Sequence, residues 1–444
     1  MPVDRYQTLT NYRHPQDSNL LDVHRAMEYN TLGQPVIRTT SGAAPTANDA
    51  FGRLRVSTPF TLFDSVHRYQ DNGKIGVYTT GTISTSTHEA HSSSILMRVG
   101  TDSGAKVYRE SNRVFAYQPG KSLTMLTTFC MAPGIPGLRQ RIGYFDANNG
   151  IYLENNGGQI SFVIRSTSQT GTTQERERVY QADWNIDPLD GNGTSTKILN
   201  LSTAQILFID VQWLGVGSSR VGFVIDGEFV PVHIFHHSNV VGETTTYMGT
   251  AFLPVRAEIE NTAATTSTST YRQICTSVLS EGGYELRGRP RSVGHALNAP
   301  RTITNQQLNT FYPMLSIRLK AGREGAIVIP RNFSVAALAA GNYTYRIIAN
   351  AVTSGGSWED PGSDSSVEYN LTATSYTNGT VFEEGFIVTS NQSSASPSLE
   401  DYPFKYQLER NNLTTPATRY EFIIAVSATS AGSVACSVNW EEVT

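Results

Sequence analysis

Residues 208–237 read FIDVQWLGVGSSRVGFVIDGEFVPVHIFHH, and this stretch decides the fold class. Apolar and polar residues alternate in it, which is the pattern of strands that bury one face. GVGSS (215–219) and Asp226-Gly227 separate the runs, and an Asp-Gly pair favours a hairpin turn because both positions take positive φ. We predict a three-stranded meander with one buried face and a third strand from Phe229 to Phe235. The residues that alternate onto the buried face are Leu207, Ile209, Val211 and Trp213, then Val221, Phe223 and Ile225.

The same pattern extends over residues 66–285. RIGYFDANNGIYLENNGGQISFVIRS (141–166) carries two further hairpin signals, Asn149-Gly150 and Asn156-Gly157-Gly158, between short apolar runs. LPVRAEIEN (253–261) alternates again. Many short strands separated by turn residues predict a β-sandwich over this region.

Residues 302–444 form a second run of strand-like segments. Seven of them are MLSIRLKAG, GAIVIPRNFSVAAL, NYTYRIIANAV, SVEYNLTATS, EGFIVTS, RYEFIIAVSATS and SVACSVNWEEV. The intervening LRGRPRSVGHALNAPR (286–301) is rich in Gly, Pro and Arg and has no periodicity, which predicts a linker. Long helical patterns are absent, so we predict an all-β protein with a β-sandwich or jelly roll at its C-terminal end.

Residues 1–65 differ from the rest because they hold short apolar patches without a core-sized element. One short helix is predicted at 18–29, with Ser18 as its cap and a partial apolar stripe. Such a segment is either disordered or an arm that gains order against another surface, and its apolar anchors favour the arm. We therefore predict an extended arm that docks on a neighbouring subunit, with these anchors: Phe51, Arg53, Leu54, Arg55 and Phe60.

Composition excludes several classes of protein. A net charge of −4 argues against a generally basic nucleic-acid binder. No apolar run reaches the roughly 18 residues of a membrane span, and the N-terminus lacks the apolar region of a secretory signal. Cys130, Cys275 and Cys436 show no paired spacing, which favours buried free thiols. The chain has 28 arginines against six lysines, a bias that suits protein–protein interfaces but also follows from genomic base composition.

The histidines at the end of the meander were weighed as a metal or catalytic centre. His233 and His237 share a face of the predicted strand, whereas His236 points away, and no nearby Cys or Asp completes a ligand set. A triad of Asp210, His233 and a serine lacks the strand–turn–helix motif that exposes a nucleophile. We therefore predict no metal, no cofactor and no catalytic residues here.

Glu258 and Glu260 are the strongest candidates for an enzyme. Paired carboxylates on one strand face supply the nucleophile and the acid in some sandwich-fold glycosidases. Arg256 shares that face, so a charged ladder is the alternative interpretation. Aromatics at the turns could stack on sugars or equally be core residues of a β-sandwich. The weak glycan-binding candidates are Trp184, Trp358, Glu258 and Glu260.

Two charged segments complete the candidates. RGRPR (287–291) has the Arg-Gly-Arg-Pro core of a minor-groove motif, but Glu281 and Glu285 precede it, so we predict inter-subunit contacts by Arg287, Arg289 and Arg291 rather than nucleic-acid binding. WEDPGSDSSVE (358–368) gathers carboxylates that could bind Ca²⁺ or form a solvated acidic turn: Glu359, Asp360, Asp364 and Glu368.

Several stretches resemble a family of virion structural proteins of tailed bacteriophages, notably those of cyanobacterial and other marine phages. The matching residues are DAFGRLRVSTPFTLFDS (49–65), LRQRIGYFDANNGIYLE (138–154), FIDVQWLGVGSSRVGFVIDGEFVPVHIFHH (208–237), LPVRAEIEN (253–261), CTSVLSEGGYE (275–285) and FYPMLSIRLKAGREGAIVIPRNFSV (311–335). The FGRLRVS-TPFTLFDS string is the most specific of them. The middle region also resembles concanavalin-type sandwiches, although the lectins' metal-ligand loop is not evident.

This resemblance implies a non-enzymatic structural part of a virion, assembled in the host cytoplasm. The expected partners are other virion proteins and copies of the chain itself, as a trimer. A tail, baseplate or fibre location is expected first, with a capsid-attached decoration or head-fibre protein, a host-glycan-binding module, and a glycoside hydrolase as successive alternatives.

Overall fold

The computed structural model describes residues 58–285, 287–390 and 406–443, together with the backbone of three short strands, β1 (Met27–Tyr29), β2 (Pro35–Ile37) and β25 (Ser393–Ala395). Residues 1–58 and 59–444 form two compact units. In the first unit β1 pairs with β2 in antiparallel register. The helix predicted at 18–29 therefore does not include Met27–Tyr29, because these residues belong to a β ladder, and residues 18–26 lie outside the described part.

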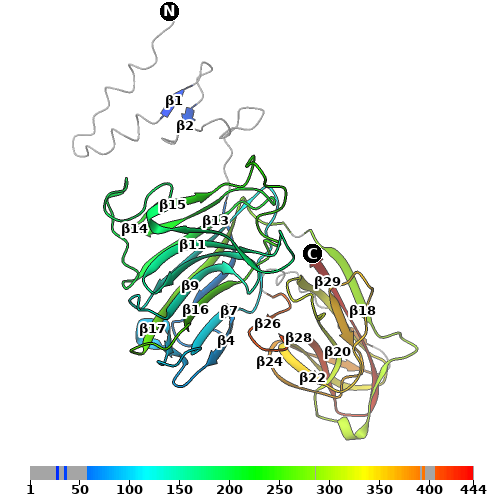
Figure 1. The fold of residues 1–444 in the computed structure, drawn as a ribbon. Coiled ribbons are helices and arrows are strands. Elements are labelled where there is room, and N and C mark those ends of the chain that lie inside the picture. The colour runs from blue at the N-terminus through cyan, green and yellow to red at the C-terminus, as the bar shows by residue number, and fades with distance from the viewer. Residues whose placement is uncertain are drawn as a thin grey trace, which may run out of the picture. The chain divides into compact units, whose positions relative to one another are not determined.

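Two antiparallel sheets form the N-terminal sandwich, whose strands run from blue to green in Figure 1. The seven-stranded sheet has the order β12 (Gln174–Tyr180), β11 (Gln159–Ser166), β10 (Gly150–Asn156), β9 (Leu138–Phe145), β16 (Val255–Asn261), β7 (Lys106–Ser111), β4 (Ile75–Thr80). The eight-stranded sheet has the order β15 (Glu228–Phe235), β14 (Ser219–Ile225), β13 (Gln205–Val211), β8 (Ser122–Cys130), β17 (Ser269–Glu281), β6 (Ser94–Val99), β5 (Thr85–Glu89), with β3 (Phe60–Val66) beside β17. The short 3-10 turns are η1 (Ala90–Ser92) and η2 (Gln181–Asp183).

The predicted meander is confirmed as β13, β14 and β15. Leu207 pairs with Phe223 and Ile209 pairs with Val221, and all four side chains are fully buried. The turn between β14 and β15 places Asp226 at φ 54° and Gly227 at φ 84°, the positive values that this dipeptide was expected to take. The alternation in the sequence therefore sets which face of this sheet meets the core.

The core of this sandwich lies between the two sheets. Ile142, Leu153 and Phe162 from the seven-stranded sheet are fully buried in one cluster with Leu207 and Phe223 from the eight-stranded sheet. Because strand side chains alternate, the residues between these positions point to the other face of each sheet. Those two outer faces carry the polar side chains considered below.

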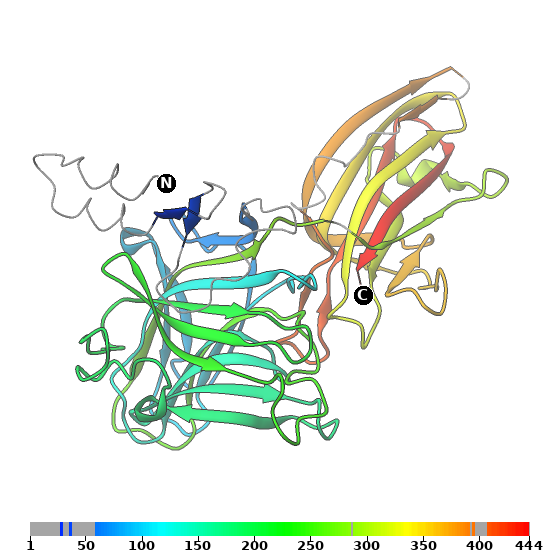
Figure 2. The same cartoon turned by 90° about the horizontal axis from the view of Figure 1, so that it is seen from above.

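The C-terminal sandwich is built from two sheets of five strands each. Its strands run from yellow-green to red in Figure 2. One sheet contains β18 (Arg289–Gly294), β29 (Gly432–Val443), β21 (Ile327–Ala337) and β25, with β19 (Arg301–Ile303) beside β29. The other has the order β23 (Val367–Asn370), β20 (Tyr312–Leu319), β28 (Glu421–Ala428), β22 (Gly341–Ser354), β24 (Ser375–Thr389). The remaining elements are η3 (Asn305–Gln307), β26 (Arg410–Asn411) and β27 (Thr418–Arg419).

The structure differs from the linker predicted at 286–301. Residues 289–294 form strand β18, and β19 begins at Arg301, and both pair with β29. β18 is at the edge of its sheet, where Pro290 and exposed charged side chains are tolerated because one side of the strand needs no backbone partner. The sequence lacks apolar alternation for the same reason: the burial along β18 is low throughout.

The end of the segment predicted as an arm is part of the N-terminal sandwich. β3 pairs with β17 from Phe60 opposite Ser280 to Val66 opposite Cys275. Phe60 stacks on Tyr284 of the same chain with ring centroids 5.8 Å apart. The other predicted anchors, Phe51, Arg53, Leu54 and Arg55, lie outside the described residues.

Apolar residues of both sandwiches meet in one small cluster. Val114 and Ala116 of the N-terminal sandwich are buried with Ile327 and Ile329 of β21. Beside them Arg113 Nη2 lies 2.8 Å from Glu409 Oε1. In the part of the chain that the structure describes, no helix is both long enough and apolar enough for a membrane crossing.

Candidate functional site: the charged face of the seven-stranded sheet

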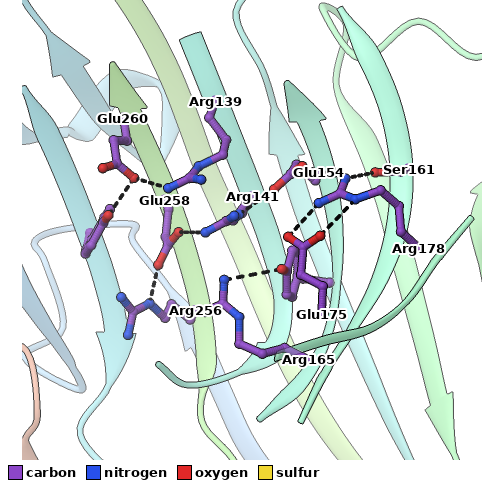
Figure 3. Close-up of polar contacts among 12 residues, drawn as sticks. Arg139, Arg141, Glu154, Ser161, Arg165, Glu175, Arg178, Arg256, Glu258 and Glu260 are labelled. Carbon is purple, nitrogen blue, oxygen red and sulfur yellow. Dashed lines mark hydrogen bonds and ion pairs between the residues drawn. The ribbon is translucent and has the colours of Figure 1, made fainter. Parts of the chain in front are cut away.

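The outer face of the seven-stranded sheet carries a lattice of charged side chains (Figure 3). We call this surface the charged face, and it consists of Tyr108, Glu110, Arg139, Arg141, Glu154, Arg178, Arg256, Glu258 and Glu260. Strand register brings opposite charges together, because β16 pairs with β9 so that Glu258 is opposite Arg141 and Glu260 is opposite Arg139. β10 pairs with β9 so that Glu154 is on the other side of Arg141.

A continuous chain of ion pairs crosses the middle of this face. Arg141 Nε lies 2.6 Å from Glu154 Oε2, and Arg141 Nη1 lies 3.3 Å from Glu258 Oε2. Glu258 Oε1 accepts a hydrogen bond of 2.7 Å from Arg256 Nε, and Arg256 Nη1 donates to Glu110 Oε2 at 2.8 Å. Each of these side chains is at least nine-tenths buried. Each of the three carboxylates in this chain of ion pairs therefore lies against a guanidinium group.

The chain of ion pairs reaches the C-terminal sandwich at Glu110. Arg410 Nη2 lies 3.5 Å from Glu110 Oε1, and Arg410 Nη1 donates to the Ser111 carbonyl at 2.7 Å. Arg410 Nε donates to the Glu324 carbonyl at 3.2 Å. This one guanidinium group thus connects the two sandwiches.

Glu260 lies nearer the rim and has its own partners. Its Oε2 accepts hydrogen bonds from Tyr108 OH at 2.7 Å and from Arg139 Nη2 at 2.6 Å. On the opposite rim Arg178 Nη1 donates to Glu154 Oε1 at 2.7 Å, and Arg178 Nη2 donates to Glu175 Oε1 at 2.7 Å. The rim side chains are partly exposed, so solvent reaches the edges of the lattice more than its centre.

The ionisation of these acids follows from their partners. Burial alone would raise the pKa of Glu154, but the charges and hydrogen bonds of Arg141 and Arg178 outweigh it, and the pKa lies below its ordinary value. Glu260 shows the same balance, with Tyr108 and Arg139 lowering its pKa against burial. Burial dominates at Glu110, whose pKa is raised although Arg410 and Arg256 oppose the shift.

Glu258 and Glu260 are not a pair of free carboxylates, because each is bonded to other side chains. Such an enzyme keeps one carboxyl protonated as an acid beside a second carboxylate that attacks the sugar or activates water. Here Glu260 holds a lowered pKa, and Glu258 is buried between two guanidinium groups. The structure shows the charged ladder, which was the alternative interpretation of these residues. Arg256 pairs with Glu258, whereas the partner of Glu260 is Arg139 and not Arg256.

The histidines occupy three separate environments. His233 Nδ1 accepts from the Asn185 backbone N–H at 3.1 Å, and burial lowers its pKa. His237 is buried against Tyr247 with its Nε2 3.0 Å from Glu177 Oε1, whereas His236 is exposed, as the strand alternation predicted. Asp210 cannot join His233, because His233 is in register with the core-facing Val221 and Ile209, one residue out of phase with Asp210.

The predicted glycan-binding aromatics do not form a platform. Trp184 is 5% exposed and packs in the core against Phe162 and Phe223. The guanidinium group of Arg318 lies over the ring of Trp358 at 3.7 Å, so one face of that ring is covered. Neither side chain presents an open aromatic face together with Glu258 or Glu260.

The predicted contact arginines differ in exposure. The side chain of Arg287 is 80% exposed and pairs with Glu285, while Arg289 is 75% exposed and lies 3.5 Å from Asp364. Arg291 is more buried and lies 2.6 Å from Asp364. These contacts occupy part of the acidic loop that was considered for Ca²⁺.

The other acids of that loop also have partners. Asp360 lies 3.0 Å from Lys320 Nζ, Glu368 lies 2.6 Å from Arg318 Nε, and Glu359 accepts a hydrogen bond from Tyr369 OH. Among the described residues, no group of three or more His, Cys, Asp or Glu side chains is placed to hold a metal ion. The three cysteines are free, and Cys436 is buried.

Sequence patterns pointed to only two of the six members of the ion-pair chain, Arg256 and Glu258. Glu110, Arg141, Glu154 and Arg410 were not predicted, and Glu110 and Arg410 are separated by 300 residues, so no local pattern connects them. A signal did exist for Arg139 and Arg141, which alternate with core residues in LRQRIGY (138–144) as Arg256, Glu258 and Glu260 do in their strand. Pairing the two alternating segments would have placed opposite charges side by side.

Comparisons with known proteins complete this description. No family model matches the chain, and no curated protein matches it. Solved structures that are similar include the carbohydrate recognition domain of Emp47p, with 10% identity over 50% of this chain and 96% of that one and a TM-score of 0.30. The β-glucanase of Bacillus licheniformis has 9% identity over 52% of this chain and 100% of its own, with a TM-score of 0.30. The CBM2 module of the evolved Dit of Lactobacillus casei BL23 phage J-1 has 6% identity over 52% and 100%, with a TM-score of 0.34. Likeness at this level assigns no function to this chain.

Proposed function

We propose that the chain is a non-enzymatic structural component of a tailed-phage virion, in the tail, baseplate or fibre system, that assembles through its N-terminal segment and exposes two β-sandwiches. The observation that carries the proposal is the buried chain of ion pairs from Glu154 to Arg410. It engages the carboxylates that could have served catalysis, and it connects the two sandwiches. Paired carboxylates and a bonded link between the two sandwiches both suit a structural protein whose domains keep a fixed geometry.

The contact between the sandwiches combines two kinds of interaction. The apolar cluster of Val114, Ala116, Ile327 and Ile329 removes apolar surface from water without fixing an orientation. The directed bonds of Arg410 and Arg113 supply that orientation, because a planar guanidinium group must meet its acceptors at set angles. Buried ion pairs contribute little net stability but define geometry, which is what a structural part requires.

The link to the N-terminal segment also supports the proposal. The second half of the FGRLRVS-TPFTLFDS string forms β3, which is hydrogen-bonded to β17 in the eight-stranded sheet. The first half precedes β3 in the sequence, so the N-terminal segment is joined covalently to a paired strand. An arm that holds the protein in a particle needs such an attachment.

Deletion of residues 1–58 tests the proposal. We expect the truncated chain to fold, because both hydrophobic cores lie within residues 59–444, and to be absent from purified particles. A Val241→Ala variant of the full chain, changed at a fully exposed side chain of the N-terminal sandwich, serves as the incorporation control. Incorporation of the truncated chain at the level of the control would contradict assembly through this segment.

A capsid-attached decoration or head-fibre protein uses the same architecture and differs only in its place. Gold labelling of an antibody against the C-terminal sandwich would separate the two: label at the tail supports the first assignment, and label over the head supports the second. Sedimentation analysis of the purified chain tests the expected trimer.

A further inference from the structure

A groove on the opposite outer face of the N-terminal sandwich lies away from the charged face. It has a volume of about 270 Å³ and runs across β13, β14, β15, β8 and β17 of the eight-stranded sheet. Its walls include Phe208 and Phe229, and its polar side chains include Thr124, Asp210, Arg220 and Glu281. All of these residues belong to one sheet, so the groove is formed without any other part of the chain.

A missing side chain on β14 shapes the apolar wall. Phe208 is directly opposite Gly222, and a Cβ atom on Gly222 would lie 2.7 Å from the ring of Phe208. Because glycine leaves this space free, the Phe208 ring lies across β14 and meets Phe229 edge-on with centroids 5.2 Å apart. Phe208 is thereby 4% exposed, while Phe229 remains 58% exposed as an open aromatic surface.

One carboxylate oxygen of Asp210 has unused hydrogen-bonding capacity. Asp210 Oδ1 is buried and accepts no hydrogen bond within the described structure, and Asp210 Oδ2 is 3.9 Å from Arg220 Nε, beyond hydrogen-bond distance. The Asp210 side chain is 24% exposed and that of Arg220 is 57% exposed. Burial raises the pKa of Asp210, although the charge of Arg220 and hydrogen bonds from Ser122 and Thr124 oppose the shift.

These features restrict the chemistry of a ligand. The groove offers an acceptor in Asp210, a donor in Arg220 and an open ring in Phe229 within one small volume. An ammonium or guanidinium ligand only donates and would meet Arg220, while an anion only accepts and would meet Asp210 and Glu281. A hydroxyl both donates and accepts, and a sugar ring adds an apolar face for an aromatic side chain.

We propose that this groove binds a hexose unit of a polysaccharide. Phe229 contacts the apolar face of the sugar ring, and Asp210 and Arg220 form hydrogen bonds with adjacent hydroxyl groups of the sugar. The site shares no residue with the glycan candidates Trp184, Trp358, Glu258 and Glu260. It adds a recognition function to the structural role proposed above and does not depend on that role.

Ligand-observed NMR on the full-length protein tests this site. Glucose, galactose and mannose are offered separately at millimolar concentration, and saturation transfer from protein to sugar is measured. We expect transfer to at least one hexose, with affinity about 2- to 12-fold lower in Phe229→Ala, since an aromatic contact is worth roughly 0.5–1.5 kcal/mol. Asp210→Asn should lower the affinity for the same hexose, because the amide nitrogen cannot accept a hydrogen bond.

Matched controls make the outcome decisive. Phe386→Ala removes another ring that is 76% exposed, on β24 of the other sandwich, and should leave hexose affinity unchanged. Unaltered thermal unfolding of Phe229→Ala shows that the variant is folded. The proposal is overturned if no hexose receives saturation, if Phe229→Ala binds as the wild type does, or if N-acetyl-arginine amide binds in place of the sugars.

Discussion

Arg410 Nη2 lies 3.5 Å from Glu110 Oε1, and both side chains are almost completely buried although they belong to different sandwiches. Arg410 makes two further hydrogen bonds, to the carbonyls of Ser111 and Glu324. Glu110 is also bonded to Arg256, so the pair is the end of the ion-pair chain that crosses the charged face. The junction between the two sandwiches therefore contains a buried ion pair as well as an apolar cluster.

Removal of the Arg410 guanidinium group should destabilise the junction strongly. Arg410→Ala leaves Glu110 buried with one cation fewer, and breaking a buried pair in this way costs about 3–5 kcal/mol. Arg287→Ala, at a side chain that is 80% exposed, should change the unfolding free energy by less than about 0.5 kcal/mol. Urea unfolding followed by tryptophan fluorescence measures both, and equal midpoints for the two variants would refute the assignment.

The stabilisation that ionised Glu154 provides should be lost in acid. Its pKa is lowered from an ordinary value of 4.5, because Arg141 and Arg178 outweigh burial, so its contribution is present above about 4.5 and is lost as the pH falls through the folded-state pKa. The wild type should therefore exceed Glu154→Gln in stability most at pH about 7, with a difference that shrinks below pH about 4. Unfolding free energies of the two proteins across this range test the sign, and a constant difference would contradict it.

Glu421 should show the opposite dependence on pH. Its side chain is fully buried and its pKa is raised above 4.5, since burial outweighs the hydrogen bond from the Thr353 N–H and the charge of Arg318. The folded state holds the proton more tightly, so this group loses stability as the pH rises from 4.5 toward the folded-state pKa. The unfolding free energy of Glu421→Gln should therefore increase relative to that of the wild type as the pH rises through this range. The same measurements across pH test this difference. A gain for the wild type instead would show that the carboxylate is well compensated.

Hydrolysis of polysaccharide is not expected from Glu258 and Glu260. The wild type should release no reducing sugar, because Glu258 lies between Arg141 and Arg256 and Glu260 is bonded to Tyr108 and Arg139. Glu258→Gln should instead lower thermal stability, since it breaks a buried ion-pair chain. Release by the wild type that disappears in Glu258→Gln would establish the glycosidase that we do not propose.

Much of the fold could be predicted from local pattern. The Asp226-Gly227 and Asn156-Gly157-Gly158 turns are present with the positive φ angles that they require, and the strands on either side of them begin and end close to the predicted residues. All seven strand segments predicted in the C-terminal region occur as β20, β21, β22, β23, β24, β28 and β29. Each of these features depends on neighbours in sequence, which is why alternation and turn chemistry were sufficient.

Features that depend on distant pairing could not be predicted. β18 has no apolar alternation because it is an edge strand, and only its partner β29, more than 130 residues later, makes it a strand. Trp184 was a glycan candidate by composition, but the packing of Phe162 and Phe223 around it decides that it is a core residue. The groove beside Phe229 likewise arises from the register that sets Phe208 against Gly222.

The oligomeric state of the full-length protein, measured together with the hydrogen exchange of residues 1–57, tests assembly through the N-terminal segment most directly. We predict an oligomer by analytical ultracentrifugation in which the amides of this segment are protected, and a monomer with two folded sandwiches after residues 1–58 are removed. A full-length monomer whose N-terminal amides are already protected would contradict the account, because the segment would then be satisfied by its own chain.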